Sequence, residues 1–195
     1  MWKYEKKLMF PVNIKKKDLA MAKVIYTQYG GPDGELAAAL RYLNQRYNMP
    51  DDRGKALLTD IGTEELNHVE MICAMLYQLM RGATVEELKA YGLDKVYAQR
   101  GKDLFPQDNN GIPFTTAYIG ATGDYLADLY ENMAAEQKAR AVYENLIDLA
   151  TDEEVLKPLI YLREREIVHF NLFKELSEYY EQKYGTNEVG YKIKQ

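Results

Sequence analysis

Two histidines occur in this sequence, and each follows a glutamate by three residues: His68 follows Glu65, and His169 follows Glu166. Positions three apart lie on one face of an α-helix, so the carboxylate and the imidazole of each pair can converge on one point. Each pair interrupts a run of apolar residues at alternating spacings of three and four, the pattern of a helix face buried in a core. An ionised carboxylate in a core must be paired or bind a metal, because burying it alone is very costly.

Two more glutamates have the helical phase needed to join these pairs. In the third predicted helix, the alternation selects Glu136 as the inward carboxylate and predicts that Glu131 faces elsewhere. In the first predicted helix, Glu35 lies in the first turn and Tyr42 lies on the same face. One glutamate from each of two helices and Glu-x-x-His from each of the other two is the arrangement of di-iron and di-manganese carboxylate bundles. The sequence therefore predicts a two-metal site.

The alternative is a metal-free core, in which each histidine is hydrogen-bonded and each glutamate pairs with an arginine. Arg140, Arg163 and Arg165 are available for such pairing. This alternative does not explain why the same polar pair recurs in matched phase on two helices, so we favour the metal site. Oxygen and imidazole ligands accept manganese and iron alike, so the ligand types do not select the metal.

The elements that must position these residues are four helices, expected at 34–48, 53–81, 124–150 and 152–183. Short links join the first to the second and the third to the fourth, as in antiparallel hairpins. A crossover at 82–123, with a short helix from Glu86 to Tyr91, joins the two hairpins. Thr84 with Glu87, and Thr151 with Glu154, have the spacing of capping boxes. This organisation predicts an all-α, ferritin-like four-helix bundle that forms a single domain over residues 1–195.

Apolar stripes define which helix faces turn inward. Besides the site residues, they are predicted to contain Leu58, Ile61, Ile72, Met75 and Leu79 in the second helix; Leu126, Leu129, Met133, Arg140, Tyr143 and Ile147 in the third; and Leu159, Leu162, Phe173, Leu176 and Tyr180 in the fourth.

Composition restricts the function further. The chain has 195 residues, of which 47% are hydrophobic, enough for a substantial core. Its net charge of -5 argues against nucleic-acid binding, which needs a clustered positive field. No apolar run is long enough to span a membrane, and the single cysteine, Cys73, cannot form an internal disulfide. We therefore expect a protein that is made and kept inside the cell.

Seven strings of residues carry a resemblance along nearly the whole chain: MWKYEKK at 1–7, YGGPDGEL at 29–36, TDIGTEELNH at 59–68, GIPFTTAYI at 111–119, ATGD at 121–124, AAE at 134–136 and REIVH at 165–169. Together they resemble the manganese catalases, and more closely the spore-coat members of that family, of the CotJC type. The resemblance implies a ligand role for five residues: Glu35 and His68 would bind one manganese, Glu136 and His169 the other, and Glu65 would bridge the two ions.

The resemblance also implies roles outside the ligand set. Glu166 would lie beyond the metals and help to move protons, and Tyr42 occupies the position of a tyrosine near the site. The implied reaction is disproportionation of hydrogen peroxide to oxygen and water by two manganese ions per chain. A homo-oligomer, a hexamer in the family, is implied as well. Spore-coat association would place the chain in the mother-cell cytoplasm and the coat, with other coat proteins as partners.

Two departures from the family pattern stand out. Some family catalases have an arginine immediately before the carboxylate that matches Glu136, where this chain has Ala135. Some also have a long C-terminal arm that embraces a neighbouring subunit, whereas this sequence ends at Gln195. Two alternative functions stay open at this point. One is a coat building block with weak or no catalysis, and the other is a ferritin-like di-iron oxidase in which all four glutamates are ligands.

Overall fold

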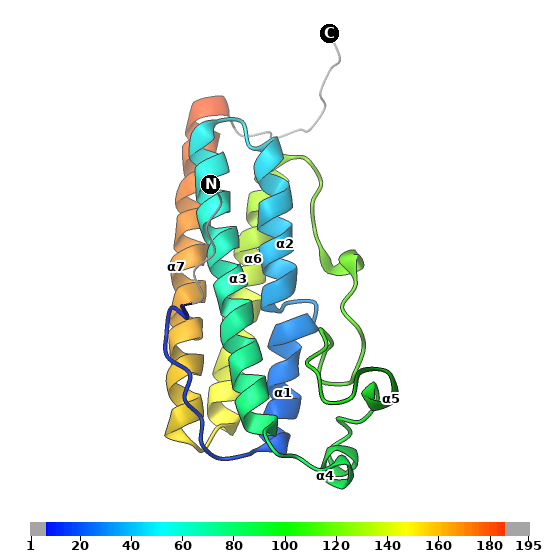
Figure 1. The fold of residues 1–195 in the computed structure, drawn as a ribbon. Helices are drawn as coiled ribbons and strands as arrows, with labels where there is room; N and C mark the ends of the chain where they lie inside the picture. Colours follow the sequence, from blue (N-terminus) through cyan, green and yellow to red (C-terminus); the bar gives the residue numbers. More distant parts are fainter. Residues whose placement is uncertain (1–6, 186–195) are drawn as a thin grey trace.

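The computed structural model describes residues 7–185, and this part of the chain folds into a helical bundle (Figure 1). Its long helices are α1 (Leu19–Gly30), α2 (Glu35–Gln45), α3 (Asp52–Met80), α6 (Tyr125–Leu149) and α7 (Glu153–Tyr184). In Figure 1, α1 and α2 lie end to end and form one column of the bundle. α3 packs against this column, α6 packs against α7, and weaker contacts between α3 and α7 and between α2 and α6 close the bundle. The predicted ferritin-like bundle is thus present.

The column formed by α1 and α2 corrects the first predicted helix, 34–48, which covers α2 and the following 3-10 turn Arg46–Asn48 but omits α1. Asp18 caps α1 by accepting a hydrogen bond from the Met21 backbone N–H. Apolar residues occur on several sides of α1, so the spacing that marks a helix with one buried face is weak in this segment. The column breaks at Pro32, since proline has no N–H to continue a helix.

The other three long helices lie within two residues of their predicted ends. Asp51, Asp124 and Asp152 cap them through side-chain oxygens. The capping box predicted for Thr151 with Glu154 is therefore wrong, because Asp152 accepts from the Glu154 backbone N–H. The predicted stripes of α3 and α7 are buried throughout. The stripe of α6 is partly wrong: its buried positions include Asp128, Asn132, Ala135 and Ala139, whereas Met133, Arg140 and Ile147 are only half-buried.

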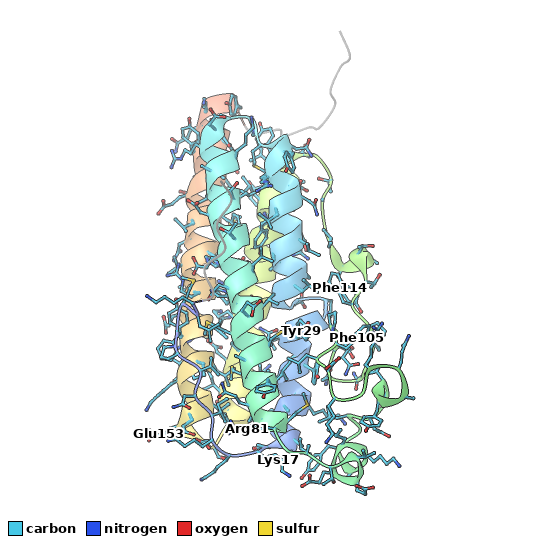
Figure 2. All side chains as sticks on the ribbon, viewed as in Figure 1. Lys17, Tyr29, Arg81, Phe105, Phe114 and Glu153 are labelled. Atoms are coloured by element: carbon cyan, nitrogen blue, oxygen red, sulfur yellow. The ribbon has the colours of Figure 1, made fainter. Side chains whose placement is uncertain are left out.

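The crossover runs along the column of α1 and α2, and thus lets α6 run in the same direction as α3 (Figure 1). It contains α4 (Val85–Ala90), α5 (Tyr97–Arg100) and a 3-10 turn at Thr116–Tyr118. α4 begins at the predicted capping box of Thr84 and Glu87. Two buried side chains of α2 fix the crossover by donating to its backbone: Arg41 Nη2 to Tyr118 O at 2.9 Å, and Gln45 Nε2 to Gly120 O at 2.8 Å. Figure 2 shows its Phe105 and Phe114 beside this column.

The apolar core consists of two large clusters, one toward each end of the bundle. One joins α1 to the later part of α3 and the first turns of α7, through residues such as Ile25, Met75 and Leu159. The other joins α2, the first turns of α3 and α6 and the later part of α7, through residues such as Leu58 and Phe173. Along α3, α6 and α7, the predicted polar residues lie between these two clusters. No helix among residues 7–185 is long and apolar enough to cross a membrane.

The close packing of Gly30 in α1 against Gln107 in the crossover predicts how a substitution at Gly30 affects the free energy of unfolding. A Cβ atom on Gly30 would lie 2.3 Å from the backbone nitrogen of Gln107, so Gly30→Ala must displace backbone. We expect a loss of about 1–3 kcal/mol in the free energy of unfolding, the usual cost of overpacking. Gly120→Ala is the control, because the nearest atoms to its Cβ would belong to side chains, with the exposed Glu131 side chain no closer than 3.3 Å. Urea unfolding monitored by circular dichroism gives both values; equal losses would contradict the proposed contact.

Candidate metal centre

All seven residues that the sequence nominated lie together in the polar layer between the two apolar clusters. Each is at most 2% exposed to solvent. They come from four helices: Glu35 and Tyr42 from α2, Glu65 and His68 from α3, Glu136 from α6, and Glu166 and His169 from α7. Glu131 lies on the outside of α6, as predicted, with a side chain that is 47% exposed.

Glu65 is at the centre of this layer, because its two carboxylate oxygens face different histidines. Its Oε2 lies 2.8 Å from His68 Nδ1, and its Oε1 lies 2.7 Å from His169 Nδ1. The two imidazole rings are nearly parallel, with centroids 5.6 Å apart and an interplanar angle of 22°. One carboxylate thus connects the Glu-x-x-His pairs of α3 and α7.

The potential metal donors fall into two groups that share Glu65. Donor atoms of Glu35, Glu65, His68 and Glu166 lie within 4.8 Å of one another, and so do those of Glu65, Glu136 and His169. Each group contains one histidine Nδ1 and carboxylate oxygens, a donor set that suits manganese or iron. Glu166 Oε1 is 3.9 Å from His68 Nδ1, so these distances accommodate Glu166 either as a ligand or as a neighbour of the ligands.

Charge balance tests whether metal ions fit this layer. Within residues 7–185, the ion-pair contacts of Glu35, Glu65, Glu136 and Glu166 are with the two histidines and with no lysine or arginine. Among the described residues, several of these atoms also form no hydrogen bond: Glu136 Oε2, Glu166 Oε1, and the pair Glu65 Oε1 and His169 Nδ1, which are 2.7 Å apart but lack hydrogen-bond geometry. Two divalent cations would balance four carboxylates and would engage these atoms, so the residues present fit a two-metal site.

The arginines proposed for a metal-free core pair elsewhere. Arg140 donates to Glu144 at 2.6 Å, and Arg163 lies 2.9 Å from Glu164. Arg165 donates to Glu64, which is outside the four carboxylates of the layer. The pairing that the metal-free alternative requires is therefore absent from the described part of the chain.

Burial and mutual repulsion raise the pKa of two of these carboxyl groups, Glu35 and Glu166. Burial, together with the charge of Glu65, raises the pKa of Glu35 to about 7. Burial and the charges of Glu35, Glu136 and Glu65 raise the pKa of Glu166 well above its usual value. Burial also acts to raise the pKa of Glu65, but the charges of His169 and His68 outweigh it and hold that pKa low. The layer therefore favours bound positive charge.

Two buried tyrosines hold the carboxylates that lie on the α2 and α6 sides of the layer. The Tyr42 hydroxyl donates to Glu136 Oε1, and the Tyr143 hydroxyl donates to Glu35 Oε1. Tyr143 was predicted to be buried but was not assigned to the site. The sequence contains a pattern that could have predicted this position: Tyr143 follows Glu136 by seven residues, or two helical turns, and so lies on the same face of α6.

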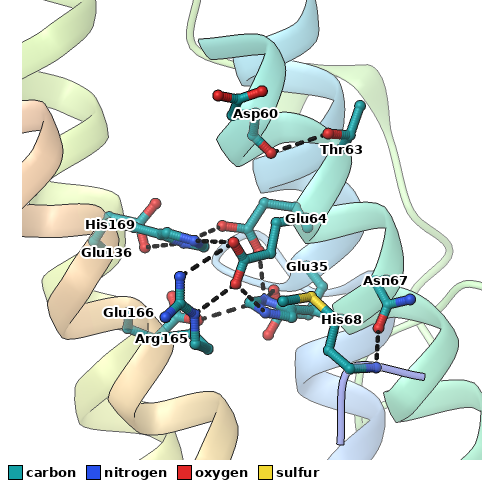
Figure 3. Close-up of polar contacts among 12 residues, drawn as sticks. Glu35, Asp60, Thr63, Glu64, Asn67, His68, Glu136, Arg165, Glu166 and His169 are labelled. Carbon is teal, nitrogen blue, oxygen red and sulfur yellow. Dashed lines mark hydrogen bonds and ion pairs between the residues drawn. The ribbon is translucent and has the colours of Figure 1, made fainter. Parts of the chain in front are cut away.

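Glu64 was also not assigned to the site from the sequence, and Arg165 was considered only as a partner for a core glutamate in the metal-free alternative. Glu64 lies on the outer side of both imidazoles, opposite Glu65, and accepts from Arg165 (Figure 3). The spacing of these two residues indicates that they are near the histidines. Glu64 precedes His68 by four residues and Arg165 precedes His169 by four, so each lies about one helical turn before a histidine.

A small cavity of about 10 Å³ adjoins the layer between α2 and α6, enough for roughly one water molecule. At one side it is lined by the α1–α2 break, where Pro32 is exposed, and at the other by buried Glu35 and Glu166. Ala135 and Ala139 of α6 complete the lining together with Arg41 and Tyr42 of α2. The break in the first column thus gives the layer a narrow contact with the surface.

The family model for manganese-containing catalases matches residues 1–189. The chain belongs to the manganese-containing catalase family. Protein CotJC of Bacillus subtilis (strain 168) is 53% identical over 178 residues, which cover 91% of this chain and 94% of that protein. A probable manganese catalase of Clostridium acetobutylicum is 37% identical over 178 residues, covering 90% of this chain and 79% of the relative.

The fold of this manganese-catalase family member also matches a solved structure. The crystal structure of KatB, a manganese catalase from Anabaena, superposes with a TM-score of 0.87 at 31% identity. The match covers 100% of this chain and 87% of KatB. The ferritin-like bundle predicted from the sequence is thereby confirmed.

Metal content gives a direct test of the layer. We expect tag-free protein, loaded with Mn²⁺ and then desalted, to retain about two ions per chain, because the donors form two groups that share one carboxylate. His68→Ala and His169→Ala should each lose at least about one ion, since each removes a nitrogen donor. Glu131→Ala is the control and should retain both ions. Elemental analysis measures the ratio, and equal loss in all three variants would contradict this assignment.

Proposed function

We propose that this chain is a dimanganese catalase, which converts two molecules of hydrogen peroxide into two of water and one of oxygen. The observation that carries the proposal is the position of Glu65, whose oxygens lie 2.8 Å from His68 and 2.7 Å from His169 and which belongs to both groups of donors. Membership of the manganese-containing catalase family supports the choice of manganese over iron, which the donors alone do not make.

In this proposal Glu35 and His68 would hold one manganese ion, Glu136 and His169 would hold the second, and Glu65, which belongs to both donor groups, would contribute to both. Glu166, the remaining member of the first group, would not be a ligand. Bound manganese would supply the electron storage, by alternating between divalent and trivalent states. Tyr143 and Tyr42 orient the carboxylates of Glu35 and Glu136 through the hydrogen bonds described above. Such hydrogen bonds to ligating carboxylates fix the direction of their lone pairs.

Glu166 is proposed as the proton carrier. Oxidation of one peroxide releases two protons, and reduction of the next consumes two, so a group that accepts and returns protons serves both halves of the reaction. Glu166 lines the cavity beside the layer, and its Oε1 has no hydrogen-bond partner among the described residues. Tyr42 lines the same cavity and is proposed to act there beside Glu166. The cavity's size favours a molecule close to water in volume, as peroxide is.

A di-iron oxidase is the second candidate, and the place of Glu166 in the first donor group favours it. In that function Glu166 would bind a metal directly and would not carry protons. The two candidates therefore differ in what the Glu166 side chain contributes.

Association with the spore coat is a further part of the proposal. It is supported by the resemblance to coat members of the family and by 53% identity to Protein CotJC. We propose a homo-oligomer, a hexamer as in the family, and coat proteins as partners within the mother cell. A role in coat assembly is compatible with catalysis, because the donor set is complete in this chain.

Oxygen evolution tests the activity. Manganese-loaded protein should release one molecule of oxygen for every two of peroxide consumed, without haem or an organic reductant. An oxygen electrode and ultraviolet absorbance of peroxide measure the two quantities on one sample. Protein that leaves peroxide untouched but consumes oxygen while oxidising ferrous iron would support the di-iron oxidase. Fully loaded protein that is inactive in both assays would support a purely structural role.

Glu166→Gln tests the proton-carrier role, because the amide keeps the size of the side chain and removes its basicity. We expect the variant to retain both metals and to lose about 100-fold or more in turnover, the usual range for general acid-base assistance. Metal content and oxygen evolution should be measured on the same preparation. Glu164→Gln, an exposed position on the same helix, is the control and should keep full turnover. Parallel loss of metal and activity in Glu166→Gln would instead identify Glu166 as a ligand.

A further inference from the structure

Glu64 contacts the outer edge of both histidines with one carboxylate. Its Oε1 lies 3.5 Å from His68 Nε2, and its Oε2 lies 3.4 Å from His169 Nε2 (Figure 3). The Nδ1 atoms of the same rings face Glu65 on the inner side. Each imidazole therefore lies between two carboxylates that are adjacent in sequence, and Glu64 repeats on the outside the two-histidine contact that Glu65 makes on the inside.

Arg165 holds Glu64 in this position with two parallel hydrogen bonds. Its Nε donates to Oε1 at 2.5 Å, and its Nη2 donates to Oε2 at 3.2 Å. Such bidentate pairs fix the plane of the carboxylate as well as its location. The pair bridges α3 and α7, and its side chains are only 17% and 27% exposed, so it also separates the histidines from solvent.

The chemistry of a metal-binding imidazole needs a group of this kind. A neutral imidazole carries one N–H, and Nδ1 can offer a lone pair to a metal only when the proton is on Nε2. A hydrogen-bond acceptor beside Nε2 selects that tautomer and fixes the ring orientation. Within the described residues, neither Nε2 atom has a hydrogen-bond partner, and the carboxylate in ion-pair contact with each of them is Glu64.

We propose that Glu64, oriented by Arg165, is a shared positioning residue that accepts the Nε2–H of both His68 and His169 when the metal site is loaded. This inference rests on the metal-binding part of the proposed function and is independent of whether peroxide is the substrate. Because one side chain serves both rings, the two metal positions are coupled through Glu64 on the outside as well as through Glu65 on the inside.

Glu64→Gln separates a positioning role from mere packing. Glutamine keeps the size of the side chain, but it has one acceptor oxygen and presents an N–H₂ group where the second acceptor was. It can therefore accept from one imidazole only. We expect the affinity for the two Mn²⁺ ions to become unequal, with one site weakened by about 10–100-fold, the usual effect of losing such a partner of a metal ligand. Competition with a fluorescent chelator measures both steps.

A spectroscopic readout follows from the sequence, because the chain contains only two histidines. In tag-free, ¹⁵N-labelled protein loaded with diamagnetic Zn²⁺, imidazole NMR should show two Nε2–H signals that are protected from exchange. In Glu64→Gln one of them should be lost. Arg165→Gln provides a second variant in case Glu64→Gln fails to fold: both signals should exchange faster, since Glu64 remains but is no longer held.

Glu144→Gln is the matched control. Glu144 also accepts from an arginine, Arg140 at 2.6 Å, and lies 3.9 Å from Arg163 of the neighbouring helix, but its contacts do not include either histidine. It should leave both metal affinities and both imidazole signals unchanged. Thermal unfolding of the metal-free proteins shows whether the variants are equally folded.

The outcomes separate this inference from the proposed function. Unequal Mn²⁺ sites and one lost Nε2–H signal in Glu64→Gln alone would support the positioning role, even if the wild-type protein evolved no oxygen. Active wild-type protein with two equal sites and two protected signals in Glu64→Gln would overturn the inference and leave the catalase proposal intact. Wild-type protein that binds neither Mn²⁺ nor Zn²⁺ would overturn both.

Discussion

Four buried carboxylates share one layer of this bundle with two imidazoles, and within residues 7–185 no lysine or arginine neutralises them. Burying that much negative charge is unfavourable unless cations are bound. Two divalent ions would offset the cost of removing the carboxylates from water and would reduce the repulsion among them. The remaining architecture serves this layer. Four helical columns must each direct a carboxylate to one place, and an apolar cluster on each side must hold their phases.

The polar layer differs between its α2–α6 side and its α3–α7 side. Between α2 and α6, the helix break and the small residues Ala135 and Ala139 leave a cavity beside Glu166. Between α3 and α7, the Glu64–Arg165 pair covers the outer edges of both histidines. In the proposed function, a small neutral molecule would approach from one side, while the histidine rings proposed to bind metal are covered on the other. This asymmetry suits a peroxide-consuming centre, in which access must be narrow and ligands must stay fixed.

Ala135, where the chain departs from the pattern of some family catalases, lines this cavity. Some family catalases have an arginine at this position, whereas here a methyl group lines the cavity. The cation that lines the cavity is Arg41 of α2, which is 3% exposed and donates to the crossover backbone at Tyr118. The crossover therefore does more than connect two hairpins, because it fixes a charged residue near the proposed entry to the metals.

The sequence by itself determined the helices with a regular apolar stripe and the residues that interrupt those stripes. Periodicity is a local property, so α3, α6 and α7, and the inward phase of Glu65, Glu136 and Glu166, could be predicted before any contact was known. α1 was missed because its apolar residues do not follow one stripe. Only the tertiary structure placed Glu64 against His169 and Arg165 against Glu64, since these contacts join α3 to α7 across about 100 residues. Spacing along one helix specifies a face, but only the packing of two helices decides which side chains meet.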